Sequence, residues 1–204
     1  MRIKVCGLTH PEHVDAAVQA GVDAIGLVLV PSVRQVSIET AARLLERIPE
    51  HIERFAVFRV PDAATVMAIS QLPFTVLQGD ATYRGPVPDG WNYVSTYRND
   101  DTVLDRLVVP PRGASWTEGL VVLDGPGDAG EGVTGNWERA RHMASRVPLM
   151  LAGGLSPDNV MAAVAAAQPV AVDVSSGVES ARGVKDPSRI AAFVRVVRDG
   201  CHQA

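Results

Sequence analysis

The sequence predicts an α/β fold, a single-domain (β/α)8 TIM barrel of near-minimal length over residues 1–204. Three observations predict it. Eight short runs rich in β-forming residues recur along the chain, and helical patterns separate most of them. The second run, residues 24–30, is almost wholly apolar, as a strand buried on both faces of a parallel sheet should be. A chain of 204 residues also lies at the lower end of the lengths known for this barrel.

The expected strands are bounded by glycine, proline or polar residues, which favour turns. They cover residues 3–6, 24–30, 54–60, 74–78, 91–97, 120–124, 148–152 and 170–174. Strands that alternate with helices favour a parallel sheet. A doubly wound open sheet is the alternative, but no glycine-rich dinucleotide fingerprint follows the first strand.

The expected helices have recognisable start signals. They cover residues 10–20, 38–48, 63–72, 101–107, 136–145, 158–167 and 188–199. Ser37 and Asp62 are predicted N-caps. Ser156 and Asp186 are also predicted N-caps, because each is followed by a proline, which favours the first position of a helix. Residues 81–90 hold two prolines and two glycines, so no helix is expected there.

Composition excludes several function classes. Apolar residues make up 47% of the chain and charged residues 21%, as in ordinary globular proteins. The net charge of −4 argues against a nucleic-acid partner. No run of about eighteen apolar residues predicts a membrane span. Cys6 and Cys201 stand far apart without metal-ligand spacing. We therefore expect a cytoplasmic protein with no metal and no cofactor.

Candidate catalytic residues lie where two expected strands end, because active sites of this barrel lie at the carboxyl ends of the strands. Cys6 ends the first strand, and a thiol is a tunable acid or base. Lys4 shares its face of the strand, so a buried ammonium would favour the thiolate; alternatively, Lys4 only pairs with a carboxylate such as Asp173. Asp124 ends the sixth strand before a loop with five glycines, where partial desolvation would keep a proton on the carboxyl group. Cys6 as core filling and Asp124 as a turn residue are the structural alternatives.

Small residues follow the seventh and eighth strands. Gly153 and Gly154 lie in LAGGLSPDNV, and Ser175, Ser176 and Gly177 lie in DVSSGVE. Their backbone N–H groups could bind a phosphate, which loops at these positions of the barrel commonly hold. Tight packing turns are the alternative.

One arginine is a candidate for binding a second anionic group. Arg34 lies in the loop after the second strand, where its planar guanidinium could bind a carboxylate through two hydrogen bonds. A solvated surface arginine is the alternative.

These motifs together resemble the phosphoribosylanthranilate isomerase family of tryptophan biosynthesis. The resemblance covers nearly the whole chain: KVCGLT, GVDAIGLVLVPSVRQVS, LAGGLSPDNV and DVSSGVE follow one another in the family's order. It implies an Amadori rearrangement of N-(5-phosphoribosyl)anthranilate to 1-(2-carboxyphenylamino)-1-deoxyribulose 5-phosphate, without a cofactor. By the same resemblance, Cys6 is the general base and Asp124 the general acid.

The resemblance also implies roles in substrate binding. Arg34 would meet the anthranilate carboxylate. Phosphate would lie on Gly154, Ser176 and Gly177, with Asp173 close by. The expected partner is a small phosphorylated substrate, and the expected protein is a monomer or a homodimer.

The chain departs from the family pattern in two loops. VLQGD replaces the family's QLHG after the fourth strand, so Gln78 is either displaced or substitutes for histidine. In the sixth loop Val133 replaces a glycine, which would narrow the pocket. Two alternatives follow: a divergent relative acting on another phosphorylated aminosugar, or a catalytically idle barrel that binds a phosphorylated ligand.

Overall fold

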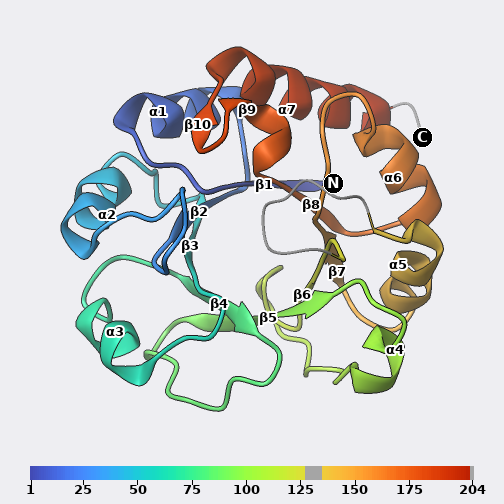
Figure 1. The fold of residues 1–204 in the computed structure, drawn as a ribbon, viewed down its shortest axis with the longest axis horizontal. Coiled ribbons are helices and arrows are strands. Elements are labelled where there is room, and N and C mark those ends of the chain that lie inside the picture. The colour runs from blue at the N-terminus through green and yellow to red at the C-terminus, as the bar shows by residue number, and fades with distance from the viewer. Residues whose placement is uncertain (127–134, 203–204) are drawn as a thin grey trace.

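The computed structural model describes residues 1–126 and 135–202. Eight parallel strands close into a barrel in chain order, with β8 paired to β1, and the helices lie around this ring (Figure 1). The predicted TIM barrel is therefore confirmed. The strands are β1 (Arg2–Cys6), β2 (Ala24–Val28), β3 (Glu53–Val57), β4 (Val76–Asp80), β5 (Asn92–Arg98), β6 (Val121–Asp124), β7 (Leu149–Leu151) and β8 (Ala171–Val174).

The helices begin at capping residues that the sequence mostly reveals. They are α1 (Pro11–Ala20), α2 (Ile38–Leu45), α3 (Ala63–Ala68), α4 (Val103–Arg106), α5 (Trp137–Ala144), α6 (Val160–Ala167) and α7 (Pro187–His202). The Ser37 hydroxyl accepts the N–H of Thr40 at 3.1 Å, and the Asp62 carboxylate accepts the N–H of Thr65 at 2.8 Å. Each bond satisfies a donor that the first helical turn leaves unpaired. Both predicted N-caps are confirmed.

One predicted cap is wrong. Helix α6 begins two residues later than expected, because residues 157–159 form a turn and Asn159, not Ser156, takes the cap position. The Asn159 carboxamide accepts the N–H of Ser156 at 2.8 Å and donates to the carbonyl of Gly154 at 2.8 Å. This side chain therefore closes the loop after β7 upon itself. Local preference alone does not predict that arrangement.

A short hairpin follows the barrel and was not predicted. After β8 the chain makes a 3-10 turn, η1 (Ser176–Val178), and then pairs β9 (Glu179–Ala181) with β10 (Val184–Lys185) antiparallel. Gly183, at φ +86°, takes the left-handed conformation in the tight connection. Figure 1 shows the hairpin between α1 and α7, in front of the barrel. It brings charged residues to the end of the barrel where the strands finish.

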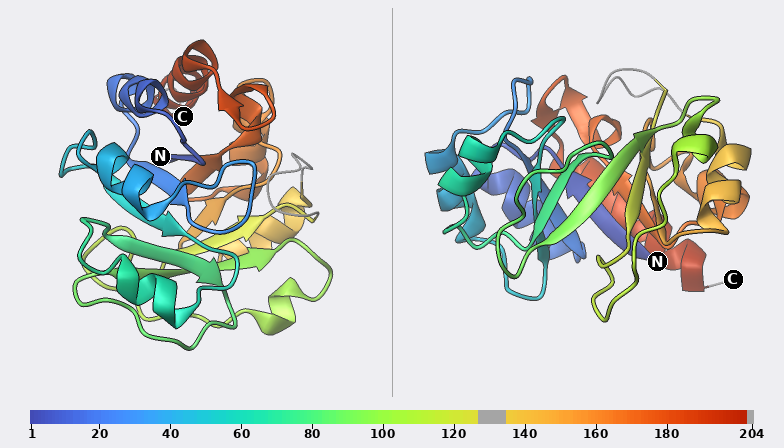
Figure 2. Two further views of the ribbon diagram at one scale, coloured as in Figure 1. Left: turned by 60° about the vertical axis from the view of Figure 1, so that its left-hand side comes forward. Right: turned by 90° about the horizontal axis from the view of Figure 1, so that it is seen from below.

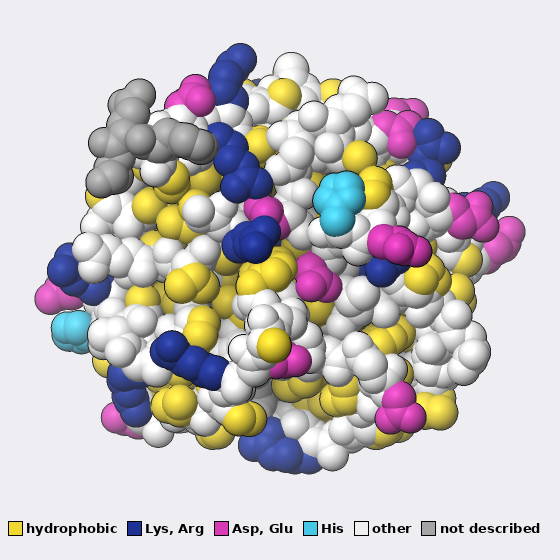
Figure 3. All heavy atoms as spheres, turned by 180° about the vertical axis from the view of Figure 1, so that it is seen from behind, with side chains coloured by type: hydrophobic (Ala, Val, Ile, Leu, Met, Phe, Trp, Pro, Cys, Tyr) yellow, Lys and Arg dark blue, Asp and Glu magenta, His cyan; other side chains and the backbone are white. Residues whose placement is uncertain are grey.

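The core has two layers. Apolar residues between sheet and helices form the outer layer, and a smaller group fills the barrel itself, including Phe55, Val94, Val122 and Met150. The strands run upward from the end that holds the N-terminus (Figure 2, right panel). On the opposite face from that seen in Figure 1, acidic and basic side chains are interspersed among apolar ones (Figure 3). No helix in residues 1–126 or 135–202 is long and apolar enough to cross a membrane.

Candidate active site

A cavity of about 490 Å³ opens at the carboxyl ends of the strands. Strand ends meet there because all eight strands are parallel, so residues distant in sequence become neighbours. Eight of the nine predicted site residues line this cavity: Cys6, Arg34, Asp124, Gly153, Gly154, Asp173, Ser175 and Ser176. Gly177 lies outside the lining. A Cβ atom at Gly177 would overlap the carbonyl oxygen of Leu155, so its described contact is close packing between two loops.

Buried charged groups lie close to the side chain of Cys6. The ammonium of Lys4, two residues earlier in β1, lies 2.8 Å from Oδ2 of Asp173 on β8. The side chains of Cys6 and Lys4 reach the space over Gly26, where a Cβ would lie 2.8 Å from Sγ of Cys6 and 3.1 Å from Nζ of Lys4. Glycine at this position in β2 therefore makes room for the cluster. Oδ1 of Asp173 is buried and has no hydrogen-bond partner among the described residues.

The ionisation of this cluster is set by burial and by charge. Burial raises the pKa of the Cys6 thiol; Lys4 lowers it, and Asp173 raises it further. Burial outweighs Lys4, so the pKa of Cys6 lies above the usual thiol value, although Lys4 itself favours the thiolate as predicted. Burial lowers the pKa of Lys4, but Asp173 and Cys6 outweigh burial and raise it. The predicted pairing of Lys4 with Asp173 is confirmed as an ion pair.

Asp124 ends β6 beside Arg98, which ends β5 in register with it. Nη1 of Arg98 donates to Oδ2 of Asp124 at 2.7 Å, and the N–H of Gly125 donates to Oδ1 at 2.9 Å. Both residues line the cavity and are partly exposed. Arg98 lies one residue beyond the predicted end of the fifth strand. Examining the first residue beyond each predicted strand would have found it.

The loops after β7 and β8 depend on glycine. Gly153 and Gly154 have φ angles of +83° and +64°, where side chains other than glycine are strained. A Cβ at Gly153 would also overlap the backbone nitrogen of Gly125. The loops after β7 and β8 both place glycine or serine in the cavity lining, and small residues are what an anion-binding loop requires.

Arg34 is buried rather than solvated. Its backbone N–H donates to Ser32 Oγ at 3.1 Å, and the aliphatic part of its side chain packs over Gly7. Its Nε and Nη2 atoms donate to the two oxygens of Glu179 at 2.7 and 2.9 Å. The two parallel hydrogen bonds predicted for Arg34 are thus made to Glu179, a carboxylate of the protein itself. The positively charged guanidinium lies at the cavity wall.

Sequence reasoning missed two charged residues of this cluster. Glu179 and Lys185 are each more than nine-tenths buried, and Oε1 of Glu179 lies 2.7 Å from Nζ of Lys185. Hydrogen bonds from Arg34, Lys185 and the N–H of Gly183 outweigh burial and lower the pKa of Glu179 to about 2. Glu179 is the last residue of the quoted DVSSGVE motif, Lys185 follows it six residues later, and Lys185 is one of only two lysines in the chain. That scarcity was the available signal.

One predicted feature lies outside the described residues. The glycine-rich loop after Asp124 contains Val133, whose effect on the pocket was predicted, and residues 127–134 are not described.

Comparisons with known proteins agree with this geometry. A family model described as N-(5'-phosphoribosyl)anthranilate (PRA) isomerase matches residues 3–196. An N-(5'-phosphoribosyl)anthranilate isomerase of Dechloromonas aromatica is 41% identical, and the match covers 97% of this chain and 96% of the relative. The chain belongs to the N-(5'-phosphoribosyl)anthranilate isomerase family.

Solved structures of the isomerase family share the barrel over its full length. One, of monomers generated from the dimeric isomerase of Thermotoga maritima, has a TM-score of 0.80 and 26% identity, with 98% of this chain and 99% of that chain covered. Another holds reduced 1-(o-carboxyphenylamino)-1-deoxyribulose 5-phosphate, with a TM-score of 0.79, 26% identity and the same coverage.

One departure from the isomerase family's pattern lies inside the cavity. Gln78 of VLQGD, which stands where the family's QLHG was expected, lines the cavity and donates from Nε2 to Thr96 Oγ1 at 3.2 Å. Its buried Oε1 has no partner in the described part of the chain. Gln78 is therefore a residue of the cavity wall.

Proposed function

We propose that this chain catalyses the Amadori rearrangement of N-(5-phosphoribosyl)anthranilate to 1-(2-carboxyphenylamino)-1-deoxyribulose 5-phosphate, a step of tryptophan biosynthesis, with Asp124 as general acid and Cys6 as general base. One observation carries the assignment of roles: a thiol from β1 and a carboxyl group from β6 line the same cavity, beside small residues of the β7 and β8 loops. Family membership over residues 3–196 favours this activity over another aminosugar or an idle barrel.

The reaction needs an acid first. Asp124 gives a proton to the ring oxygen of the ribose as the bond from C1′ to that oxygen breaks. The lone pair of the anthranilate nitrogen then forms a double bond to C1′, which leaves an iminium ion. A protonated carboxyl group has one O–H donor and keeps acceptor capacity, so the N–H donors of Arg98 and Gly125 can still hold Asp124 when it carries the proton.

The base acts second. The thiolate of Cys6 removes the proton from C2′, and the electrons of that bond form the double bond of an enolamine. Proton return to C1′ and loss of the hydroxyl proton at C2′ give the ketone. Lys4, held by Asp173 beneath Cys6, stabilises the negative charge on sulfur before the transfer.

The remaining predicted residues bind the substrate in this proposal. Gly153, Gly154, Ser175 and Ser176 hold the phosphate between the β7 and β8 loops, and Gly177 allows these loops to pack closely. Arg34 supplies positive charge for the anthranilate carboxylate. Asp173 binds a substrate hydroxyl through Oδ1, which has no partner among the described residues. A buried acceptor without a donor is costly, and a ligand donor would remove that cost.

We also propose a cytoplasmic enzyme that is a monomer or a homodimer. Cys6 and Cys201 are both free thiols, as is usual in reducing compartments. The Thermotoga maritima relative is described as dimeric. Sedimentation velocity of the purified protein distinguishes the two states.

The decisive experiment follows the loss of anthranilate-type fluorescence when the protein meets N-(5-phosphoribosyl)anthranilate generated in situ. We expect turnover by the wild-type chain and none by the Cys6→Ala variant. Absence of turnover by folded wild-type protein would contradict the proposed substrate, and a screen of phosphorylated aminosugars would follow. Equal turnover by both proteins would contradict the role of Cys6.

A further inference from the structure

Both lysines of this chain are buried beside Cys6. Lys4 and Lys185 are 0% and 2% exposed, whereas every other basic residue in the chain, histidines aside, is an arginine. Buried ammonium groups are rare unless they are paired. Lys4 has Asp173 and Lys185 has Glu179 as ion-pair partners. The reaction proposed above uses the first of these lysines and leaves the second without a role.

Lys185 is linked to the backbone of Cys6 through one residue. Its ammonium donates to Oε1 of Glu179 at 2.7 Å, to the carbonyl of Ser175 at 2.9 Å and to the hydroxyl of Ser175 at 3.1 Å. An ammonium has three donors, so these contacts use all of them. The Ser175 hydroxyl in turn donates to the carbonyl of Cys6 at 3.0 Å. The charge of Lys185 is thereby fixed near the thiol.

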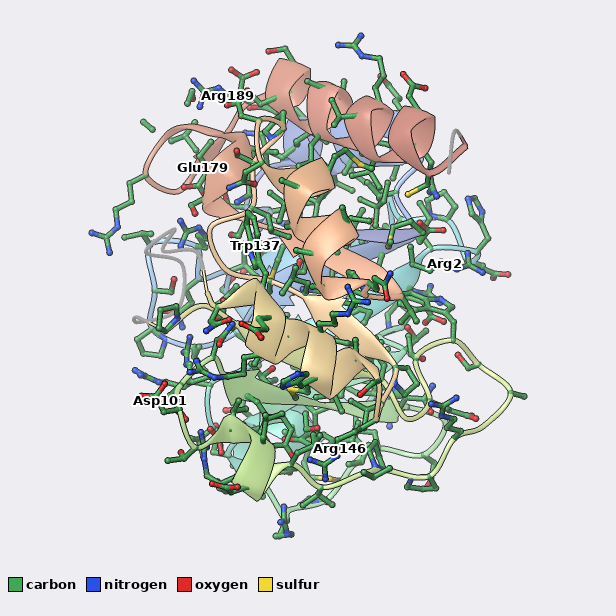
Figure 4. All side chains as sticks on the ribbon, turned by 90° about the vertical axis from the view of Figure 1, so that its right-hand side faces the viewer. Arg2, Asp101, Trp137, Arg146, Glu179 and Arg189 are labelled. Atoms are coloured by element: carbon green, nitrogen blue, oxygen red, sulfur yellow. The ribbon has the colours of Figure 1, made fainter. Side chains whose placement is uncertain are left out.

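Charged groups face Cys6 from several elements. Lys4 comes from β1, Asp173 from β8, Arg34 from the loop after β2, and Lys185 from β10. Glu179, at the start of β9, is the ion-pair partner of both Arg34 and Lys185. Glu179 and Arg2 lie toward opposite ends of the barrel (Figure 4).

A histidine lies near the same cluster. His13 on α1 faces Lys185 and Glu179, and burial lowers its pKa, which favours the neutral ring.

The formal charges of these groups leave one positive charge near the sulfur. Lys4 and Asp173 cancel each other, and Glu179 cancels one of the two cations Arg34 and Lys185. Without Lys185 the cluster around Cys6 would be neutral. A net positive charge favours a thiolate over a thiol, and its effect is strong where water is excluded.

We propose that Lys185 is a positioning residue for the rearrangement: it supplies the net positive charge that stabilises the Cys6 thiolate, and it holds Ser175 against the backbone of Cys6. This inference rests on the proposed role of Cys6 as general base. Burial raises the pKa of Cys6, and Lys4 and Lys185 both act against burial. Two ammonium groups therefore share a task that the sequence suggested for Lys4 alone.

The test measures ionisation of the thiol without any substrate. In a Cys201→Ser background Cys6 is the only thiol. Its alkylation by iodoacetamide, followed from pH 6 to 10, reports the thiolate fraction because the thiolate is the reacting form. For both Lys185→Met and Lys185→Gln we expect a rate constant at pH 8 that is about three- to tenfold lower, and a midpoint at higher pH. The glutamine variant keeps a hydrogen-bond donor near Ser175 and so isolates the charge.

A double variant provides the matched control. Lys185→Met with Glu179→Gln removes one positive and one negative charge, so Arg34 restores the net charge near Cys6. We expect alkylation to return to within about threefold of the background protein. If Lys185 acts only through packing, the double variant reacts as slowly as the single one, and that result overturns the proposal. Unchanged alkylation in Lys185→Gln overturns it as well.

Misfolding and failure of the general-base assignment give different results. An unfolded variant exposes Cys6, which then reacts faster, the opposite of the expected change. Turnover that survives Cys6→Ala would remove the catalytic role of Cys6, whereas the alkylation profile would still report whether Lys185 stabilises the thiolate.

Discussion

Lys4 and Asp173, which are 169 residues apart in the chain, are register partners on the first and last strands of the barrel, and Nζ of Lys4 lies 2.8 Å from Oδ2 of Asp173. Their ion pair joins β1 and β8, the two strands whose pairing closes the barrel. Both residues are buried, and Nζ of Lys4 also lies 5.2 Å from the ring centroid of Phe55 inside the barrel. One interaction therefore belongs both to closure of the fold and to the floor of the active site.

The first prediction concerns the stability of this pair. Lys4→Met leaves Asp173 buried without its counter-charge, so we expect the free energy of unfolding in urea to fall by about 3–5 kcal/mol at pH 7. The double variant Lys4→Met with Asp173→Asn removes both charges and should recover a substantial part of that loss. Equal losses in the two proteins would show that packing by the lysine stem, and not charge, makes the contribution.

The second prediction concerns the general base. Cys6→Ser replaces a thiol by a hydroxyl, which ionises far less readily, so we expect kcat to fall at least about a hundredfold. Stopped-flow fluorescence of the anthranilate group measures it. Cys201→Ser is the matched control, because Cys201 lies in α7 outside the cavity lining, and it should stay within about twofold of wild type. A near-normal kcat for Cys6→Ser would exclude the assigned role.

The third prediction concerns the general acid. Asp124→Asn keeps the size of the side chain and its bonding capacity toward Arg98 but cannot deliver a carboxyl proton. We expect kcat to fall at least about a hundredfold. Asp80→Asn alters a neighbouring carboxylate at the end of β4 that also lines the cavity, and it should lower kcat less than about threefold. Comparable losses in both variants would point to the summed charge of the cavity rather than to a positioned acid.

The fourth prediction concerns binding of the substrate carboxylate. Arg34→Ala should raise KM at least about tenfold with a smaller change in kcat, because the contact is made equally in the ground state and the transition state. Steady-state kinetics give both constants. An unchanged KM would indicate that another cation of the cavity wall binds the substrate carboxylate. Arg59 and Arg182 both line the cavity.

The fifth prediction concerns acid stability. The pKa of Glu179 is lowered from 4.5 to about 2, so its ionised form stabilises the fold fully above pH 4.5. This contribution, on the order of 3 kcal/mol, is lost progressively as the pH falls from 4.5 toward 2. Urea unfolding of wild type and Glu179→Gln at pH 7, 5, 4 and 3 should therefore show a stability difference that shrinks with acid. If the difference in the free energy of unfolding between wild type and Glu179→Gln did not change with pH, the stabilisation would come from the hydrogen-bond geometry of Glu179 and not from its charge.

Periodicity and capping residues were sufficient for the fold. Every expected strand is present within three residues at each end, because buried parallel strands are apolar runs and turn residues bound them. Ser37 and Asp62 cap helices through local bonds that depend only on neighbouring residues. Ser156 does not, because its own N–H donates to the Asn159 carboxamide, which also binds the carbonyl of Gly154, and helix α6 begins after Asn159.

The sequence by itself determined the barrel and the residues at its strand ends, since strand order places Cys6, Asp124, Asp173 and Ser175 at one end of any closed parallel sheet. Only the tertiary structure decided which charges meet there. Arg34 pairs with Glu179 because a hairpin absent from the prediction brings β9 to the cavity, and Lys185 reaches Ser175 by the same route. Ion pairs between segments far apart in the chain depend on side-chain distances, and local sequence patterns do not contain those distances.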